Sequence, residues 1–166
     1  MYMLSSRLCY VAVHHLYEGV ERISTCFSQL SEEDIWRNHN ANLVSIGNLV
    51  LHLQGNVSQY IIQGLGGEEY HRHRDGEFSE KPGLSREELL ERITGTIDQA
   101  AGVIEGLDEA ALLRAITIQG FEHTGLSALI HVVEHFSYHV GQITFATKYL
   151  KDVDLGYYAG LDLNAQ

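Results

Sequence analysis

The near absence of proline is the feature of this sequence that most limits its fold. Pro82 is the only proline in 166 residues, so long stretches contain no residue that would break a helix. Within those stretches apolar residues recur every three or four positions instead of alternating, which predicts amphipathic helices. The length suits one domain, and a hydrophobic share of 45% supplies enough apolar surface for a core. We therefore expect residues 1–166 to form a single all-α domain.

Four long helices are expected, and local signals mark several of their ends. They run roughly from Ser5 to Gln29, from Leu43 to Gln63, from Ser85 to Glu105 and from Gly125 or Leu126 to Leu150. Glycines at 64, 66 and 67 end the second helix, and Ser85 with Glu88 forms a capping box at the start of the third. Residues 31–34 are expected to form a short capped turn, residues 115–118 a short extended piece, and residues 152–166 a mostly irregular tail.

The link between the second and third helices is unusually long. Residues 65–84 are mostly polar or glycine, and they are far more than a turn between antiparallel helices needs. A link of this length can cross the bundle from end to end, which lets the second and third helices run parallel. We therefore expect a four-helix bundle with a long crossover connection between helices two and three.

The charge of the chain argues against two classes of partner. It carries 22 acidic and 11 basic residues, for a formal net charge of -11, and this would repel both a phosphate backbone and an anionic membrane surface. The N-terminal apolar run is interrupted by Arg7, His14, His15 and Glu18, so it resembles neither a signal peptide nor a membrane span. We expect a soluble, cytoplasmic protein that binds no nucleic acid and no membrane.

Only two cysteines are present, and they are not expected to pair. If Cys9 and Cys26 both lie on the first helix, a rise of about 1.5 Å per residue separates them by about 25 Å. A disulfide needs much closer Cα atoms. Reduced thiols agree with a cytoplasmic location.

Histidines recur at helical spacing in the last helix. His131, His135 and His139 follow one another at four-residue steps and therefore share a helix face, beside rather than within the apolar stripe. Two imidazoles one turn apart can chelate one ion, whereas all three at once would be strained. Spacing alone thus indicates a ligand pair without choosing which two residues form it.

The second helix offers a third histidine in a similar place. His52 shares a polar stripe with Ser45, Asn48, Asn56 and Gln59, next to an apolar stripe. If the two helices meet along these boundaries, His52 completes a three-histidine set and leaves a coordination position open, as in catalytic sites. The alternative is that both stripes are solvated faces on which histidine is merely one of several polar residues.

Several motifs together resemble the DinB-like (DinB/YfiT) superfamily. They are Trp36, Asn40, Ser45-Ile46-Gly47-Asn48-Leu49, His52-Leu53 and His135-x-x-x-His139-x-Gly141-Gln142. The resemblance implies a four-helix bundle, often a homodimer, in which one histidine of helix two and two of helix four bind nickel, zinc or a similar divalent ion. The matching positions here are His52, His135 and His139. His131 is then an additional residue behind the ligands, and His14 and His15, which the family pattern does not explain, are expected on the surface or at a bundle edge.

The same resemblance implies more than one function. The family includes bacillithiol-dependent S-transferases and a mycothiol-dependent isomerase, alongside many members without known activity. It therefore implies a metal-dependent S-transferase with a low-molecular-weight thiol as cosubstrate, or a hydrolase that uses metal-bound hydroxide. Gln142, Tyr138, Glu134 and Asn48 lie near enough to position a ligand. The alternative is a non-catalytic metal-binding dimer with a structural or sensing role.

Two other metal sites compete with this interpretation. His131-Val-Val-Glu134-His135 matches the inverted zinc-protease pattern, which would use His131 in place of His139 and Glu134 as the base. A di-iron carboxylate bundle needs Glu-x-x-His on two helices, but the match at Glu68 and His71 falls in the long link. The charged run from residue 68 to 74 is expected to be solvated.

Overall fold

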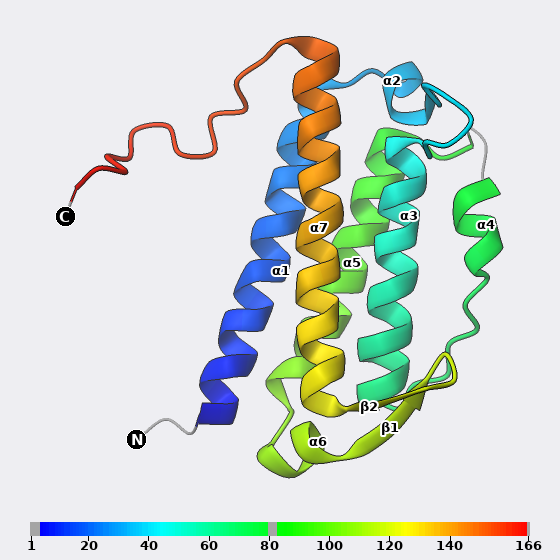
Figure 1. The fold of residues 1–166 in the computed structure, drawn as a ribbon, viewed down its shortest axis with the longest axis vertical. Coiled ribbons are helices and arrows are strands. Elements are labelled where there is room, and N and C mark those ends of the chain that lie inside the picture. Colours follow the sequence, from blue (N-terminus) through cyan, green and yellow to red (C-terminus); the bar gives the residue numbers. More distant parts are fainter. Residues whose placement is uncertain (1–3, 80–82, 166) are drawn as a thin grey trace.

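A computed structural model describes residues 4–79 and 83–165, and its regular elements are helices and one two-stranded hairpin (Figure 1). Its elements are α1 (Leu4–Gln29), α2 (Glu32–Trp36), α3 (Ile46–Val57), the π-helix η1 (Ser58–Leu65), α4 (Arg74–Ser79), α5 (Arg86–Glu105), α6 (Glu109–Leu113), β1 (Ala115–Ile118), β2 (Phe121–Thr124) and α7 (Gly125–Lys151). The all-α class expected from the sequence is confirmed.

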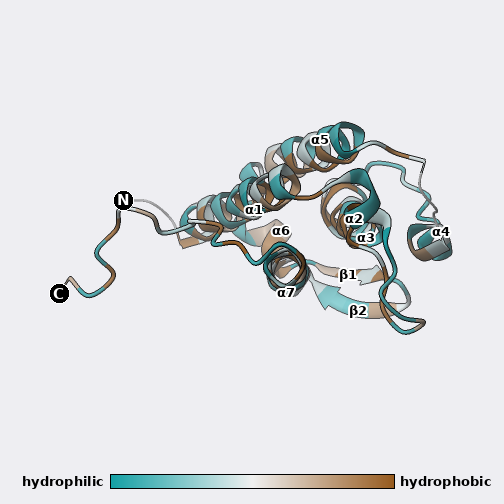
Figure 2. Ribbon diagram, turned by 90° about the horizontal axis from the view of Figure 1, so that it is seen from above, coloured by the Kyte–Doolittle hydropathy of each residue, from teal (hydrophilic) through white to brown (hydrophobic). Residues whose placement is uncertain are grey.

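The long helices form a bundle in which two run up and two run down. In Figure 1, α1 and α7 ascend while α3 and α5 descend. Helix α1 packs against α5 and α7, and α3 packs against the same two helices. The link from η1 to α5 returns along the outside of the bundle through α4, which lies beyond α3 in the view from above (Figure 2). The parallel helices and the crossover connection were both predicted.

The core is formed by the apolar stripes of the long helices. Its fully buried side chains include Leu16, Ile23, Phe27, Leu53, Ile61, Leu89, Ile93, Ile97, Ile104, Leu129, Phe136 and Ile143. They recur at three- and four-residue spacing, as expected for helices that bury one face. This packing fixes α3 and α7 side by side, which is the condition for their histidines to meet.

The helix ends follow capping chemistry that the sequence shows only in part. The predicted capping box at Ser85–Glu88 is present, and the short turn predicted at residues 31–34 is capped by a box between Ser31 and Asp34. The second long helix begins at Ile46 rather than Leu43, because Ser45 has extended backbone angles and its hydroxyl accepts from the Asn48 backbone N–H. The capping partner three residues after Ser45 is Asn48 rather than the usual glutamate or glutamine, so the sequence does not clearly indicate this start.

Three local features differ from the expected elements. Residues 58–65 continue the second helix as a π-helix, and residues 74–79 form a helix inside the expected loop. The extended piece at 115–118 pairs antiparallel with residues 121–124, with Ala115 opposite Thr124. Positive φ angles of 55° at Gln119 and 80° at Gly120 provide the tight turn that joins the two strands.

The cysteines and the tail agree with expectation. Cys9 and Cys26 are both buried free thiols. Helix α7 ends at Lys151, and the next residue, Asp152, has a left-handed φ of 49° that turns the chain. The described tail beyond it forms only isolated turns. Tyr157 of the tail lies against Arg22 of α1, with the guanidinium 5.2 Å from the ring centroid. Within residues 4–79 and 83–165, no helix is long and apolar enough to cross a membrane.

Candidate metal centre

Three histidines from two helices converge between α3 and α7. The potential ligand atoms of His52, His135 and His139 all lie within 4.8 Å of one another. His52 Nε2 and His135 Nε2 are 2.9 Å apart, so these nitrogens face each other directly. His52 is 6% exposed, while His135 and His139 are half-buried. Among the residues that the structure describes, this is the group of three or more such side chains with metal-binding spacing.

A buried ion pair fixes the orientation of the His52 ring. Arg72 donates from Nε to Glu77 Oε1 at 2.6 Å and from Nη2 to Glu77 Oε2 at 2.8 Å. Glu77 Oε2 also lies 2.9 Å from His52 Nδ1. Arg72 Nη2 is 3.2 Å from the same nitrogen, but it donates to Glu77 Oε2 and to the backbone oxygen of His52, so we assign the His52 proton to Nδ1 as a donor to Glu77. This tautomer leaves the Nε2 lone pair directed at the other histidines, as in carboxylate–histidine–metal arrangements.

The long link supplies this ion pair because α4 lies directly against α3. Asn48 donates from Nδ2 to the backbone oxygen of Glu77 at 2.9 Å, which ties α4 to α3. Gly55 provides the space, because a Cβ there would lie 2.0 Å from Glu77 Oε1. Arg72 is held in turn by Gln59 of η1, whose Oε1 accepts from Nη1 at 3.0 Å. A glycine one turn after His52 is therefore required for the carboxylate to reach the histidine.

The second ligand helix orients His139 in a comparable way. His139 Nδ1 is 2.7 Å from Gln142 Oε1, and since an amide oxygen can only accept, Nδ1 carries the proton. This leaves His139 Nε2 unprotonated and free to bind an ion. The Tyr138 ring lies edge-on to His139 at 5.0 Å, and the Phe78 ring of α4 lies 4.9 Å from His52. Aromatic rings thus flank the histidines on two sides.

The surroundings of His135 and His139 favour the neutral form of their imidazoles, which is the form that binds metal. Burial, together with the neighbouring charges of His139, His52, His131 and Arg72, lowers the pKa of His135 to about 3. Burial also lowers the pKa of His139, against an opposing effect of its hydrogen bond to Gln142. Burial alone would raise the pKa of Glu77, but hydrogen bonds from Arg72 and His52 outweigh it, and the pKa is lowered. At pH 7 a charged Glu77 carboxylate therefore lies beside a cluster in which His135 and His139 are neutral.

His131 lies outside the three-histidine cluster. Its ring stacks on His135 at 5.4 Å with an interplanar angle of 19°, and it lies 4.6 Å from the Tyr60 ring of η1 at a tilt of 34°. The Tyr60 ring in turn lies 5.6 Å from His123 of β2. His131 therefore packs against the ring of His135 without belonging to the ligand group, as expected for a residue additional to the three ligands.

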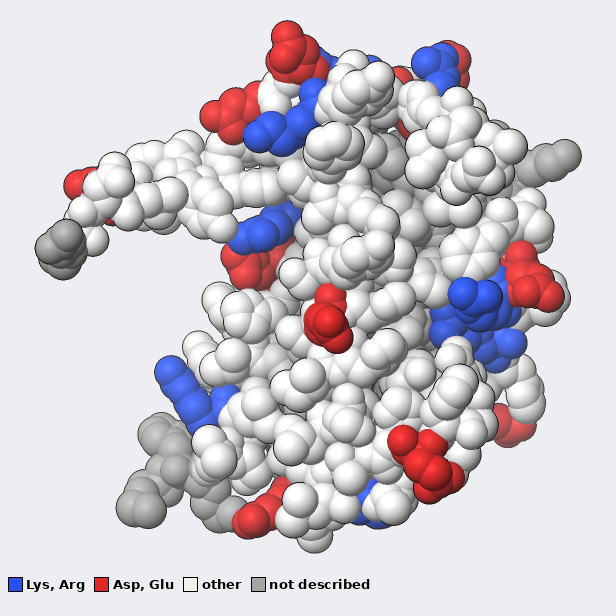
Figure 3. Space-filling view, in the orientation of Figure 1, with Lys and Arg blue, Asp and Glu red and all other residues white. Residues whose placement is uncertain are grey.

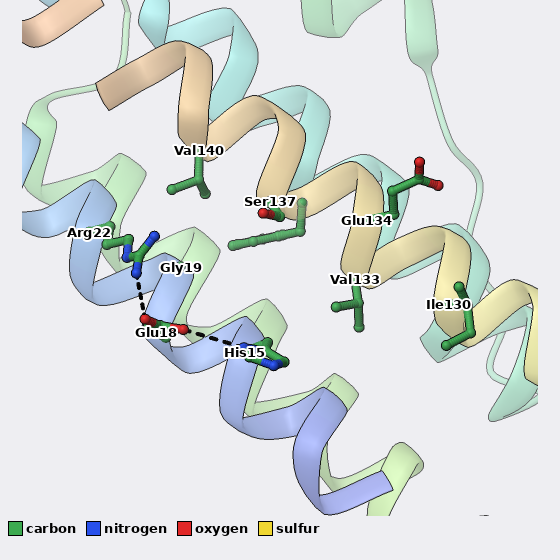
Figure 4. A pocket seen from close by; sticks show the side chains of 10 residues that line it. His15, Glu18, Gly19, Arg22, Ile130, Val133, Glu134, Ser137 and Val140 are labelled. Atoms are coloured by element: carbon green, nitrogen blue, oxygen red, sulfur yellow. Dashed lines mark hydrogen bonds and ion pairs between the residues drawn. The ribbon is translucent and has the colours of Figure 1, made fainter. Parts of the chain in front are cut away.

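The structure does not favour the inverted zinc-protease arrangement. Glu134 lies on a different face of α7, in a cleft of about 370 Å³ between α7 and α1 (Figure 4). The other wall of this cleft carries His15 and Arg22, which both contact Glu18. His14 and His15 are exposed, as expected for surface residues. Glu134 cannot serve as a base at His135 from this position.

The sequence interpretation missed two functional neighbours of the cluster. The run from residue 68 to 74 was expected to be solvated, and this is wrong for Arg72, whose side chain is 3% exposed. His71 is exposed, as expected, and it pairs in solvent with Glu69. Glu77 is 9% exposed although it lies in the expected loop. No local pattern distinguishes these two charged residues from their solvated neighbours, because their burial depends on where α4 docks.

Comparisons with known proteins agree with the fold. A family model described as a protein of unknown function (DUF1572) matches residues 7–158. The structure resembles a conserved protein from Enterococcus faecalis, with 13% identity, a TM-score of 0.71, and coverage of 84% of this chain and 94% of that one. It also resembles a DinB-like protein from Bacillus subtilis, with 17% identity, a TM-score of 0.65, and coverage of 86% and 94% respectively. No curated protein matches the sequence significantly. The chain therefore belongs to the family of unknown function DUF1572 and has the fold of DinB-like proteins.

Proposed function

We propose that this chain binds one divalent transition metal ion through His52, His135 and His139, and that the ion serves a transferase or hydrolase reaction. The observation that carries the proposal is the convergence of three ring nitrogens within 4.8 Å, two of whose rings are held by hydrogen bonds at Nδ1. Imidazole ligands suit zinc and nickel, which are the metals we propose. Three protein ligands leave a coordination position for a substrate.

The residues of the chain would prepare the ligands rather than perform the reaction themselves. Glu77, held by Arg72, keeps the proton of His52 on Nδ1, and Gln142 does the same for His139. A divalent ion bound there would lower the pKa of a coordinated thiol or water and so provide a nucleophile near neutral pH. A low-molecular-weight thiol is the cosubstrate we propose for a transferase. A homodimer is the assembly we propose, in line with the DinB-like resemblance.

The proposal is tested on protein isolated without an affinity tag, stripped of metal and reloaded with zinc or nickel. We expect metal-dependent turnover when low-molecular-weight thiols are offered with electrophiles, or when activated esters are offered alone. The His139→Ala variant should lose it, because an ion held by two histidines is bound much more weakly. Absence of metal-dependent turnover across both panels would contradict a catalytic role.

A structural role for the metal is the second candidate function. It is favoured because His52 of α3 is buried where α3 packs against α7. An ion that joins two core helices would stabilise their packing as well as bind substrate. Chelation separates the two functions. A structural ion should lower the melting temperature greatly on removal, whereas a catalytic ion should lower it only modestly.

A further inference from the structure

A long groove begins at the metal-binding cluster and follows the C-terminal half of α7. Its volume is about 1020 Å³, which matches the upper end of the range for small-molecule sites. One wall is formed by α7 between residues 138 and 150, and the opposite wall by residues 37–44 and the start of α3. Phe78 of α4 also lines it.

The groove leads to the open side of the histidine cluster. His139 and Gln142 are part of its wall. Other sides of the cluster are covered, because Glu77 and Arg72 lie behind His52, and His131 stacks against His135. A molecule in the groove would therefore approach the ion next to His139.

The lining of the groove is mainly apolar, and much of it is exposed to solvent. Leu43 is 54% exposed, Phe145 73% and Tyr149 78%, while Leu49 is partly buried at the base. A contiguous exposed apolar surface of this kind is costly unless it binds something. Because this surface lies next to a metal-binding cluster, it favours a small organic molecule as the ligand. Such a molecule can bind the ion and contact the apolar wall at the same time.

The charge of the groove narrows the class of ligand further. Among the described residues that line it, none is Asp or Glu, although the chain contains 22 acidic residues. The polar residues Arg37, His39, Asn40 and Asn42 all lie in the segment before α3, where Arg37 also pairs with Glu33 outside the groove lining. Figure 3 shows the surface between the upper parts of α7 and α3 largely in white, with charged side chains toward its margins. This distribution suits a neutral or anionic ligand and disfavours a cation.

We propose that this groove is the substrate site of the metal centre and that it takes a small molecule with an aromatic or branched aliphatic body. The metal-binding group lies at His139, the body lies between Leu49 and the aromatic residues of α7, and a neutral or anionic polar end faces Asn40 and Arg37. The proposal rests on the proposed metal centre. It adds the class of substrate, which the three histidines alone do not define.

The test uses the cobalt(II)-loaded protein, in which visible absorption reports an added ligand at the metal. The probes are imidazole and 4-phenylimidazole, which share a metal-binding group and differ in the apolar body. We expect 4-phenylimidazole to bind at least about tenfold more tightly, because its phenyl ring leaves water. Leu49→Ala and Tyr138→Ala should each reduce the ratio of the two affinities several-fold, and this ratio is insensitive to any change in metal binding that affects both probes equally. Tyr10→Ala on α1 is the matched control, since Tyr10 is 61% exposed and Tyr138 is 62% exposed.

Equal affinity for the two probes, with cobalt bound normally, would overturn the groove assignment and leave the metal centre intact.

A metal-free measurement keeps the two proposals separate. Nuclear magnetic resonance shifts should show 3-phenylpropionate binding to the groove residues more tightly than 3-phenylpropylammonium. Tighter binding of the ammonium compound would refute the charge argument. If light scattering shows a dimer that Tyr138→Ala converts to a monomer, and neither probe preference appears, the groove is a contact between two copies and the proposal is wrong.

Discussion

Replacing Glu77 by glutamine separates the carboxylate's effect on the histidine cluster from the space it occupies. Glutamine keeps the shape of the side chain but removes the charge that holds the Nδ1 proton of His52 and the guanidinium of Arg72. Loss of such a partner of a metal-binding histidine typically weakens metal binding about 10- to 100-fold, or about 1.4–2.8 kcal/mol. We expect the dissociation constant of zinc to rise by this amount in a competition titration with a chelator of known affinity.

The same substitution should also destabilise the metal-free protein. The side chains of Arg72 and Glu77 are 3% and 9% exposed, so removal of one charge leaves the other buried without a partner. Breaking a buried pair in this way typically costs about 3–5 kcal/mol, which urea unfolding can measure. Combining Glu77→Gln with Arg72→Met should recover most of this stability, because no unpaired charge remains, but it should not recover metal affinity.

A second glutamate–histidine pair in the same link serves as the control. Glu69 contacts His71 at the surface, where the two side chains are 86% and 89% exposed. Glu69→Gln should change neither metal affinity nor stability measurably, since exposed pairs contribute little. If Glu77→Gln binds zinc as tightly as the unchanged protein, the assigned role of Glu77 is refuted.

Three further predictions follow from the packing and the charges. Gly55→Ala should weaken metal binding as Glu77→Gln does, because the added Cβ would displace the Glu77 carboxylate. Gly102→Ala on α5 is the matched control, because a Cβ there meets open space, and it should stabilise the protein by about 0.5–1 kcal/mol in urea unfolding. The free energy of unfolding of the metal-free protein should decrease as the pH falls from 6.5 toward 3, because His135 binds a proton in this interval when unfolded but not when folded. A free energy from urea unfolding that does not change over this pH range would contradict the prediction. Asp34 has its pKa lowered to about 2 by Lys151 and Ser31, so its contribution is present above pH 3.8 and lost toward pH 2, and Asp34→Asn should lower stability at pH 7 by about 1 kcal/mol.

The long helices could be predicted because their signals are local. A chain with one proline and helical apolar spacing has few alternatives, and the capping box at Ser85 marks an end that the structure confirms. The start at Ile46 was missed because asparagine, rather than an acidic residue, completes the cap of Ser45. The π-helix was missed because it covers only residues 58–65, too short a stretch for the apolar pattern to indicate a change from i→i+4 to i→i+5 hydrogen bonds.

The histidines of the site could be predicted, but the groups that orient them could not. Four-residue spacing places His135 and His139 on one face, and core packing brings His52 to them. Choosing between His131 and His139 needs the rotation of α7 relative to α3, which spacing does not contain. Burial of Arg72 and Glu77 depends on the docking of α4 against α3, and this docking is possible because Gly55 has no Cβ.

The central claim is that His52, His135 and His139 bind one divalent ion, and metal content tests it most directly. Elemental analysis of untagged protein, together with zinc titration of the stripped protein and of each single alanine variant, measures the stoichiometry and its origin. We expect one ion per chain, loss of tight binding in His52→Ala, His135→Ala and His139→Ala, and retention in His131→Ala. Retention in His139→Ala with loss in His131→Ala would contradict the assignment, and failure of the unchanged protein to bind any divalent transition metal would refute the account.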